Sequence, residues 1–547
     1  MTPWLEGWRG GLLLCAFALA AWGALGFAGF VWDDEALVVG NRYTGELSNL
    51  PKLFTLDLWE TSELGETSGY YRPLMLLSLA LDRALWGLSP AGAHLHSLGW
   101  HLAASLLLLG LLRSLVPPLP AWLGAAMFAL HPAQSEAVAW VVARNDLMAA
   151  AFVFASIRAL LPAAVSPVRL LAGGLAMVAA LLSKESAVLA VVLLGLLDLA
   201  RWGRPKGYAR YAALLGAVGG VVGLRAAVGI QATAFPMEAG RQLLLERAPD
   251  VAALYGRRLL WPWPLSVGET LEYLAVPPLE VALWLSGVAA LVAVTLLRGK
   301  RLALAGWLFA GAAFAPSLLA VAIRGQLGER YLYLPLAGIA VAVAASVPAR
   351  RASLVVGGVV VAAWMTALNL RLPEWRSGQT LFAAAVEDSP NGFTFAELGH
   401  ELNREEATRD EAVEWFMRAL ADDPPYADVC PNVIRQPLGR GQVERAWANA
   451  QYARERGCPA TPTFRGLYAS AAAQNGAWDG AREALDGQAC DALDGRGLVV
   501  AAALARIDGD DIGDDIGIES LAACAGVSSV ELASQSEKLL MVSEGQR

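Results

Sequence analysis

Long apolar stretches recur along the chain from its start to about residue 370, separated by short polar loops. Stretches of this length and apolarity are typical of helices that cross a bilayer. We therefore predict about eleven membrane-spanning helices. They are placed at residues 11–31, 94–113, 121–137, 146–161, 168–183, 186–200, 208–229, 279–297, 302–323, 331–347 and 352–370.

Beyond residue 370 the pattern changes to that of soluble amphipathic helices. The apolar positions after Phe395 follow the spacing of a tetratricopeptide unit, and weaker matches come later. The positions of the first unit are Ala412, Phe416, Ala419 and Pro424, and the weaker matches lie at 438–453 and 467–485. Because each unit buries its apolar face only against a neighbour, we expect stacked units from 375 to about 504.

The predicted fold is therefore all-α, with a membrane domain at 1–370 and a soluble helical-repeat domain at 371–547. Composition agrees, since 56% of the 547 residues are hydrophobic, 19 are Trp and the mean hydropathy is +0.45. The net charge of −8 divides into about +5 for the membrane domain and about −13 for the tail. Membrane lipids are expected partners, and no nucleic-acid partner is expected.

Basic residues occur mainly in alternate loops. Since loops rich in Lys and Arg usually face the cytoplasm, this pattern predicts the orientation of the chain in the membrane. Arg9 precedes the first span, which we predict to be an uncleaved helix because it is long enough to cross the bilayer. The other basic loops contain Arg113, Arg158, Arg169, Arg201, Arg204, Lys206, Arg210, Arg298, Lys300, Arg301, Arg350 and Arg351. The segments 32–93 and 230–278 and the whole tail then face outward.

The Ala/Gly/Arg-rich composition and the short loops favour the inner membrane of a bacterium. The N-terminus would be cytoplasmic and the C-terminal domain periplasmic. Within the external segments, residues 72–86 are typical of an amphipathic helix at the membrane interface. Residues 257–264 combine arginine, tryptophan and proline, which suits an anchor at headgroup level.

Three consecutive carboxylates, Asp33, Asp34 and Glu35, follow the first span. Charge is costly inside a bilayer, so the triplet is either the hydrated end of a helix or a functional site. Taken alone, it leaves both alternatives open. Paired carboxylates also suit general-base chemistry, in which one accepts a proton and the other holds the reacting hydroxyl or a metal.

Further charged residues are predicted on the same side, and together they favour a functional site over incidental helix ends. The group contains His131, Glu136, Arg144, Asp146, Lys184, Glu185, Arg72, Arg324, Arg330 and the neighbouring Tyr331. Taken singly, His131 is more typical of a structural histidine, and Lys184 and Glu185 are typical of an ion pair between helices. Arginines at such a site suit a phosphate, because the planar guanidinium donates two hydrogen bonds at once.

Four of the five cysteines lie in the tail, at Cys430, Cys458, Cys490 and Cys524. In an exported protein this even number predicts two disulfides, whose pairing the sequence leaves open. The acidic segment 508–515 lacks the Glu that closes a calcium loop, so we predict a solvated turn and no metal site there.

Several short motifs occur in an order that resembles the transmembrane and tetratricopeptide-repeat-containing O-mannosyltransferases. They are Trp32-Asp33-Asp34, Tyr71-Arg72-Pro73-Leu74, Leu130-His131-Pro132, Glu136-Ala137-Val138, Ala143-Arg144-Asn145-Asp146, Leu182-Ser183-Lys184-Glu185, Glu329-Arg330-Tyr331-Leu332-Tyr333-Leu334-Pro335, the segment from Asn369 to Trp375, and Thr380-Leu381-Phe382. Each motif alone is weak, and the combination is specific. The resemblance covers the chain to about Pro424.

The resemblance implies a glycosyltransferase of the GT-C fold that takes a sugar, such as mannose, from a polyprenyl-phosphate carrier on the non-cytoplasmic face. Asp33 would be the catalytic base and Asp34 its support. The substrate and lipid-phosphate site would comprise Arg72, His131, Glu136, Arg144, Asp146, Arg330 and Tyr331. Transfer would invert the anomeric centre, with Arg330 or Arg72 stabilising the departing phosphate. No metal or other cofactor is expected to be required, and a divalent metal stays an open alternative.

The acceptor expected from the resemblance is a Ser or Thr hydroxyl of an exported protein that docks on the repeats. One alternative keeps the fold and transfers the sugar to a lipid or glycan. Another is a non-catalytic membrane scaffold that uses its repeats to organise a complex. A transporter is disfavoured, because the sequence shows no inverted repeat and its acids lie at one surface.

Overall fold

The computed structural model is 78% helical over the residues that it describes, and contains no strand there. The all-α prediction is confirmed. The described residues are 5, 7–63, 65–230, 237–422, 425–486, 493–507, 522, 524 and 526–545. The predicted acidic turn at 508–515, together with Pro424 and Cys490, lies outside them.

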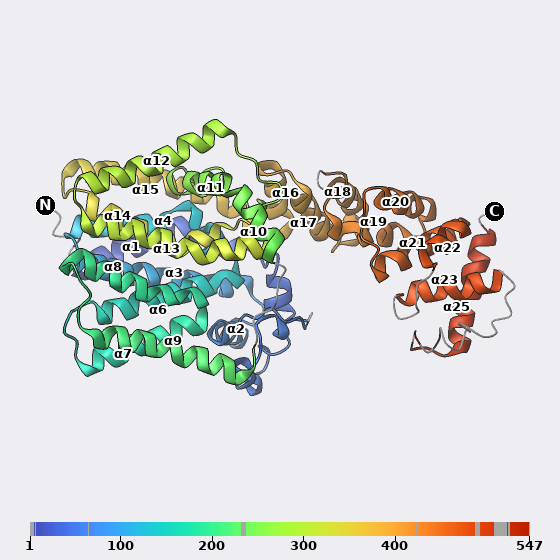
Figure 1. The fold of residues 1–547 in the computed structure, drawn as a ribbon, viewed down its shortest axis with the longest axis horizontal. Helices are drawn as coiled ribbons and strands as arrows, with labels where there is room; N and C mark the ends of the chain where they lie inside the picture. Colours follow the sequence, from blue (N-terminus) through green and yellow to red (C-terminus); the bar gives the residue numbers. More distant parts are fainter. Residues whose placement is uncertain are drawn as a thin grey trace. The chain divides into compact units, whose positions relative to one another are not determined.

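The chain forms two compact units, Met1–Ala384 and Ala385–Arg547. We call them the membrane unit and the repeat unit. In the membrane unit each of the eleven predicted spans overlaps a helix, although several of the bounds differ (Figure 1). These helices are α1 (Gly7–Trp22), α3 (Pro90–Arg113), α4 (Pro118–Leu130), α6 (Arg144–Leu160), α7 (Pro167–Ser183), α8 (Ala190–Trp202), α9 (Tyr208–Val228), α12 (Pro278–Leu297), α13 (Arg301–Arg324), α14 (Tyr333–Ser346) and α15 (Arg351–Arg371).

Six continuous helices in the described part of the chain are long and apolar enough to cross a membrane, or up to seven if one bent pair counts as a span. The six include α3, α9, α12, α13 and α15, and α1 qualifies together with η2 (Gly23–Phe27). Helices such as α4, α8 and α14 have 13 or 14 residues. The protein therefore has several candidate spans, and the total of about eleven crossings stays a prediction.

Short segments of irregular structure separate several of these helices and lie close to one another. Pro132, two residues after α4 ends, cannot continue the helix, and the chain turns through η7 (Pro132–Gln134), α5 (Ser135–Ala139) and η8 (Val141–Ala143) before α6. Similar breaks are η9 (Glu185–Leu189) before α8 and η10 (Glu329–Leu332) before α14. Segment η10 contacts η7 and α5, and η9 contacts α6 and α13.

The two loops predicted to be external contain further helices. The helix expected at 72–86 is present as α2 (Pro73–Trp86), which packs on α3 and α7. The second loop contains α10 (Met237–Glu246) and α11 (Ala248–Leu260), and its residues 231–236 lie outside the described part.

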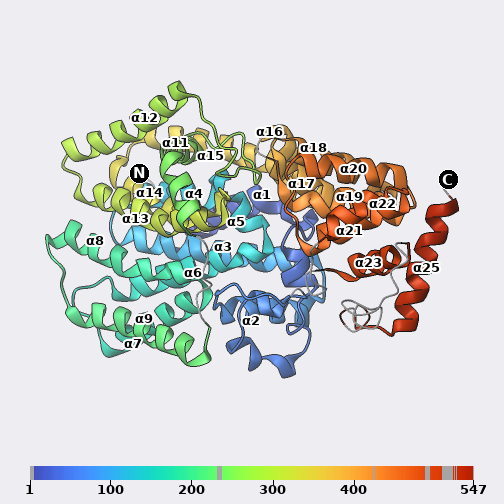
Figure 2. The same cartoon turned by 45° about the vertical axis from the view of Figure 1, so that its right-hand side comes forward.

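Short helices in successive contact make up the repeat unit (Figure 2). They are α17 (Gly392–Leu402), α18 (Arg409–Ala421), α19 (Cys430–Gly439), α20 (Val443–Glu455), α21 (Pro462–Gln474), α22 (Trp478–Leu485), α23 (Gly495–Ile507) and α25 (Ser529–Gly545). Helices α17 and α18, α19 and α20, and α21 and α22 pack as neighbours, and each such pair also contacts the next. A disulfide joins Cys430 to Cys458. Cys524 is also disulfide-bonded.

The boundary between the units lies at Ala384, later than the predicted boundary at residue 370. The reason is that the segment after α15 packs into the membrane unit. It forms η11 (Leu372–Arg376) and the start of α16 (Gly378–Asp388). The Trp375 side chain is fully buried, and the Trp375 carbonyl accepts a hydrogen bond of 3.1 Å from the backbone N–H of Gly29.

Candidate functional site

The loop that carries Asp33 is held in an unusual backbone conformation. Trp32 has a φ of +54°, which makes it the one non-glycine residue of the described chain in the left-handed region. Such a conformation is costly and persists where the surroundings enforce it. The Trp32 ring stacks on Trp140, with centroids 4.9 Å apart, and meets the edge of Phe382 at 5.9 Å. Residues distant in sequence therefore fix the loop.

Asp34 is fully buried and faces into this loop. Its Oδ1 accepts a 2.9 Å hydrogen bond from the backbone N–H of Val142, and its Oδ2 accepts one of 3.2 Å from Val31. The pKa of Asp34 is raised to about 8, chiefly by burial. The two N–H groups lower this pKa, and the charge of Asp33 raises it further. At neutral pH Asp34 then keeps its proton and ties the loop to η8.

Asp33 differs from its neighbour because its carboxylate makes no hydrogen bond or ion pair with the described residues. It is half-buried. Burial raises the pKa of Asp33 to about 6, and the charges of Arg330 and Arg324 oppose the rise. When two neighbouring carboxyl groups have separate pKa values, the environment assigns them separate roles. Asp33 is the member that is ionised and available at neutral pH.

Arg330 lies beside Asp33 in an aromatic cage. Its guanidinium carbon is 4.9 Å from the ring centroid of Trp140, 4.8 Å from that of Tyr331 and 5.8 Å from that of Trp32. Cations are attracted to aromatic faces at such distances, most strongly where water is excluded. The cage holds the guanidinium in one place.

Glu136 fixes Arg330 from the other side. This fully buried carboxylate forms an ion pair with the Arg330 guanidinium and also accepts hydrogen bonds from the backbone N–H groups of Glu329 and Arg330. Segment η10 is thereby attached to α5. Burial lowers the pKa of Arg330, but Glu136 and Tyr331 outweigh it and the net shift is upward, so Arg330 stays charged.

Two further ion pairs complete the cluster. Arg72 donates to Glu185 from Nε at 3.2 Å and from a terminal nitrogen at 2.9 Å, and Lys184 Nζ lies 2.6 Å from Asp146 Oδ2. Burial raises the pKa of Glu185, but the charge of Arg72 outweighs it and the net shift is downward. The charges of Arg72 and Arg330 both act on Lys184. The structure thus brings three cations and their carboxylate partners into one group, in which the charge of Arg330 acts on Asp33. We call this group, with Asp33, the Asp33 cluster.

Arg144 and His131, which we predicted in the substrate site, have internal partners instead. Arg144 is fully buried, with a 2.6 Å ion pair to Asp82 and hydrogen bonds to Ser97 Oγ and the Ala93 carbonyl. His131 is buried between the backbone N–H of Ala133 and the carbonyl of Leu259. Both side chains therefore hold elements together in this structure, and their contact with substrate stays a prediction.

Sequence reasoning missed Trp140 altogether, and it placed Phe382 only in the motif that leads into the tail, not in the site. The buried Trp140 supports both Trp32 and Arg330, and its Nε1–H has no hydrogen-bond partner in the described structure. No local motif distinguishes Trp140 from an ordinary core aromatic, whereas Phe382 closes the Thr380-Leu381-Phe382 motif. The described residues contain no group of three or more His, Cys, Asp or Glu side chains that could hold a metal ion.

Comparison with curated proteins finds relatives that are named as protein O-mannosyl-transferases. TMTC3 of Mus musculus is 33% identical over 146 residues, which are 26% of this chain and 16% of the relative. Tmtc1 of Drosophila melanogaster is 36% identical over 182 residues, 31% of this chain and 20% of the relative. The chain is related to the TMTC proteins over this segment. The resemblance predicted from the motifs is thereby confirmed.

A further TMTC protein, Tmtc2 of Drosophila melanogaster, is 37% identical over 142 residues, 25% of this chain and 15% of the relative. The chain thus matches between 15% and 20% of the length of these three TMTC proteins. No family model matches the chain, and no solved structure matches it.

Proposed function

We propose that this protein is a membrane glycosyltransferase of the GT-C fold that moves a sugar, such as mannose, from a polyprenyl-phosphate carrier to a hydroxyl group of a protein. The observation that carries the proposal is the Asp33 carboxylate. It is ionised near neutral pH, lacks a hydrogen-bond partner within the described structure and lies on a strained loop beside a fixed cation. The names of the TMTC relatives support transfer to protein.

The proposed step is a single displacement. Asp33 accepts the proton of the acceptor hydroxyl as the oxygen attacks the anomeric carbon. The bond from that carbon to the carrier phosphate breaks, and the phosphate leaves with the electron pair. Attack and departure on opposite faces of the carbon invert its configuration. Asp34, neutral at this pH, holds the loop in place and does not compete for the proton.

The departing phosphate needs cations that are already in place. Arg330 and Arg72 are restrained by aromatic rings and by carboxylates, so little reorganisation is needed as negative charge develops. Lys184 supplies a third cation, held by Asp146. The unpartnered Nε1–H of Trp140 is a donor suited to a sugar hydroxyl.

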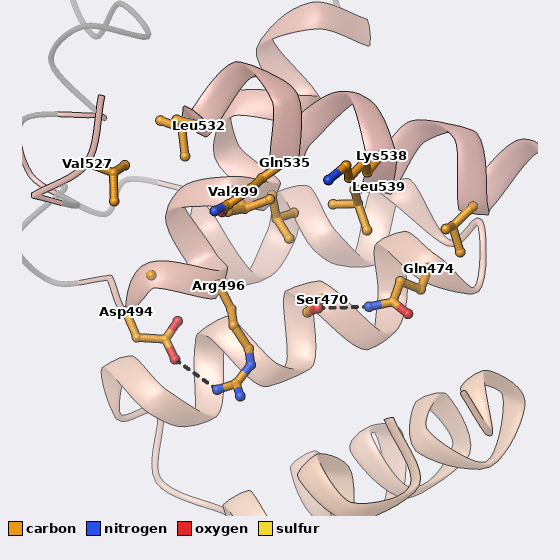
Figure 3. Close-up of a pocket in the computed structure, with 13 residues that line it drawn as sticks. Ser470, Gln474, Asp494, Arg496, Val499, Val527, Leu532, Gln535, Lys538 and Leu539 are labelled. Atoms are coloured by element: carbon orange, nitrogen blue, oxygen red, sulfur yellow. Dashed lines mark hydrogen bonds and ion pairs between the residues drawn. The ribbon is translucent and has the colours of Figure 1, made fainter. Parts of the chain in front are cut away.

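A groove in the repeat unit supports docking of a protein acceptor. It has a volume of about 560 Å³ and lies among residues of α21, α23 and α25 (Figure 3). Apolar side chains such as Val499, Leu532 and Leu539 line it together with the polar Gln474 and Gln535. Apolar side chains together with amide groups in one groove suit an extended peptide, whose backbone needs hydrogen-bond partners.

We propose a bacterial inner-membrane location, with Asp33 and the repeat unit on the periplasmic side. The alternating basic loops and the disulfide in the repeat unit support this orientation, because disulfides persist in oxidising compartments.

The test is sugar transfer by the purified full-length protein. Polyprenyl-phosphate mannose labelled in the sugar is supplied with Ser/Thr-containing peptides, and both labelled peptide and free polyprenyl phosphate are measured. The expected result is equal release and transfer, lost in Asp33→Asn and retained in the matched control Glu35→Gln. Full transfer by Asp33→Asn, or none by the wild-type protein with any polyprenyl-phosphate sugar, would contradict the proposal. Repeating the assay with chelator measures metal dependence.

A further inference from the structure

An apolar cavity lies in the membrane unit. Its volume is about 660 Å³. Its walls come from α11, α12, α14 and α15, and all four helices lie on one side of the unit in both views (Figures 1 and 2). The lining includes Leu291 and Val294 of α12, Val343 of α14 and Val360 of α15. A cavity of this size and polarity suits a hydrocarbon chain.

One end of the cavity is cationic. Arg298 and Lys300, which follow α12, both line it. Lys300 Nζ donates hydrogen bonds to the carbonyls of Ser346 at 2.8 Å and Ala345 at 3.4 Å, and these neutral partners leave its charge uncompensated. The Arg298 guanidinium has no hydrogen-bond or ion-pair partner in the part of the chain that the structure describes. Two positive charges at the end of an apolar cavity suit a ligand that combines an anionic group with a hydrocarbon chain.

This cationic end is far from Asp33. Helix α13 begins at Arg301, next to Lys300, and ends at Arg324, whose charge acts on Asp33. Its 24 residues span about 36 Å at 1.5 Å per residue, which is the thickness of a bilayer's apolar core or more. An anion held at Arg298 would therefore lie at the opposite membrane surface from the candidate site.

The cavity is also open to the surroundings of the unit. Leu291, Val294 and Val360 are between 36% and 43% exposed, although they line it. In a membrane this exposure is toward lipid. At its other end the cavity is lined by Trp261, Pro262 and Trp263, beyond α11.

We propose that this cavity is a binding site for one anionic phospholipid of the leaflet opposite to the Asp33 cluster. The phosphate group is held by Arg298 and Lys300, and an acyl chain lies along the apolar walls toward Trp261. The charge of the site selects an anionic headgroup. The bound lipid is distinct from a sugar donor, because its phosphate is out of reach of Asp33. The proposal is therefore independent of the proposed transferase function.

The test is native mass spectrometry of the purified full-length protein titrated with phosphatidylglycerol or with phosphatidylcholine. We expect one phosphatidylglycerol to be retained preferentially. Arg298→Gln should weaken its binding about tenfold or more, as expected for loss of a charged hydrogen-bond partner. Arg301→Gln removes the same charge from the same surface but does not line the cavity, so it should leave binding unchanged.

A second pair of variants tests the acyl-chain part of the site. Ala363→Trp places a large ring in the cavity and should abolish retention, while Ala362→Trp, at the neighbouring exposed position outside the lining, should not. Three outcomes would overturn the proposal: equal losses in Arg298→Gln and Arg301→Gln, equal retention of the two lipids, or preferential retention of polyprenyl phosphate, which would make the cavity a carrier site. Thermal unfolding of each variant separates loss of binding from loss of fold.

Discussion

The raised pKa of Asp33 gives the transferase proposal a pH signature. A general base acts only when it is deprotonated, so the rate should rise with pH through the pKa of Asp33 and then level off. Burial raises that pKa to about 6, although Arg330 and Arg324 oppose the shift. The rising limb of the pH–rate profile should therefore have its midpoint at a pH well above the pKa of an ordinary carboxyl group.

The size of the effect follows from the titration of one group. With a pKa of about 6, the deprotonated fraction is about a tenth at pH 5, half at pH 6 and about nine tenths at pH 7. The transfer rate should therefore increase about tenfold between pH 5 and pH 7. Replacing Arg330 by Gln removes a charge that lowers the pKa of Asp33, so the limb should move to higher pH in that variant.

The assay is single-turnover transfer of labelled sugar from polyprenyl-phosphate mannose, measured in detergent at constant ionic strength between pH 4.5 and 8. Single turnover isolates the chemical step from product release. Glu35→Gln removes a carboxylate two positions from Asp33 and should leave the rising limb of the pH–rate profile unchanged. Asp34→Asn resembles the neutral form of Asp34 and should retain more activity than Asp33→Asn.

A limb with its midpoint near pH 4 would refute the argument from burial. So would a rate that does not depend on pH between 5 and 7 in a protein shown by circular dichroism to stay folded. If Asp34→Asn lost activity as completely as Asp33→Asn while remaining folded, the assignment of separate roles to the two carboxyl groups would be wrong.

Three further predictions concern other parts of the molecule. Arg330→Gln should lower the transfer rate about a hundredfold, because a fixed cation at a leaving group contributes most in the transition state; Arg330→Gln with an unchanged single-turnover rate at its own optimal pH would contradict this role. Cys430→Ser opens a disulfide between residues 28 apart and should lower the free energy of unfolding of the repeat unit by about 3–4 kcal/mol, measured by denaturant titration with and without reductant. Val542→Asp, in the groove of the repeat unit, should raise KM for a peptide acceptor without changing kcat, whereas Met541→Asp, outside the lining, should change neither.

The helices of the membrane unit could be predicted because long apolar runs are a strong local signal. The breaks in them were harder to place. Pro132 shows in the sequence why α4 ends, but the extended backbone of Lys184 after α7 has no such marker. The prediction treated the apolar run as the element, whereas the structure ends several helices early and uses the remaining residues to build the cluster.

The candidate site was predicted in part. The charged residues of the motifs do lie close together. A carboxylate or guanidinium at the end of an apolar helix is costly to place in the bilayer, so it pairs with other charged groups at the same end. The sequence could not assign the pairs. Asp146 binds Lys184, while Arg144, two positions earlier, turns inward to Asp82 of α2. That choice depends on how α2 packs beside α6, which no local pattern encodes.

The position of Phe382 affects where this protein can be truncated without disturbing the candidate site. A truncation after Leu370, where the apolar sequence stops, would look natural for isolating the membrane unit. It would discard Phe382 and Trp375, which contact Trp32 and Gly29, and so remove part of the support of the Asp33 loop. A fragment intended to retain the site should extend at least through Ala384. An inactive shorter fragment would therefore say nothing about whether the repeat unit takes part in the reaction.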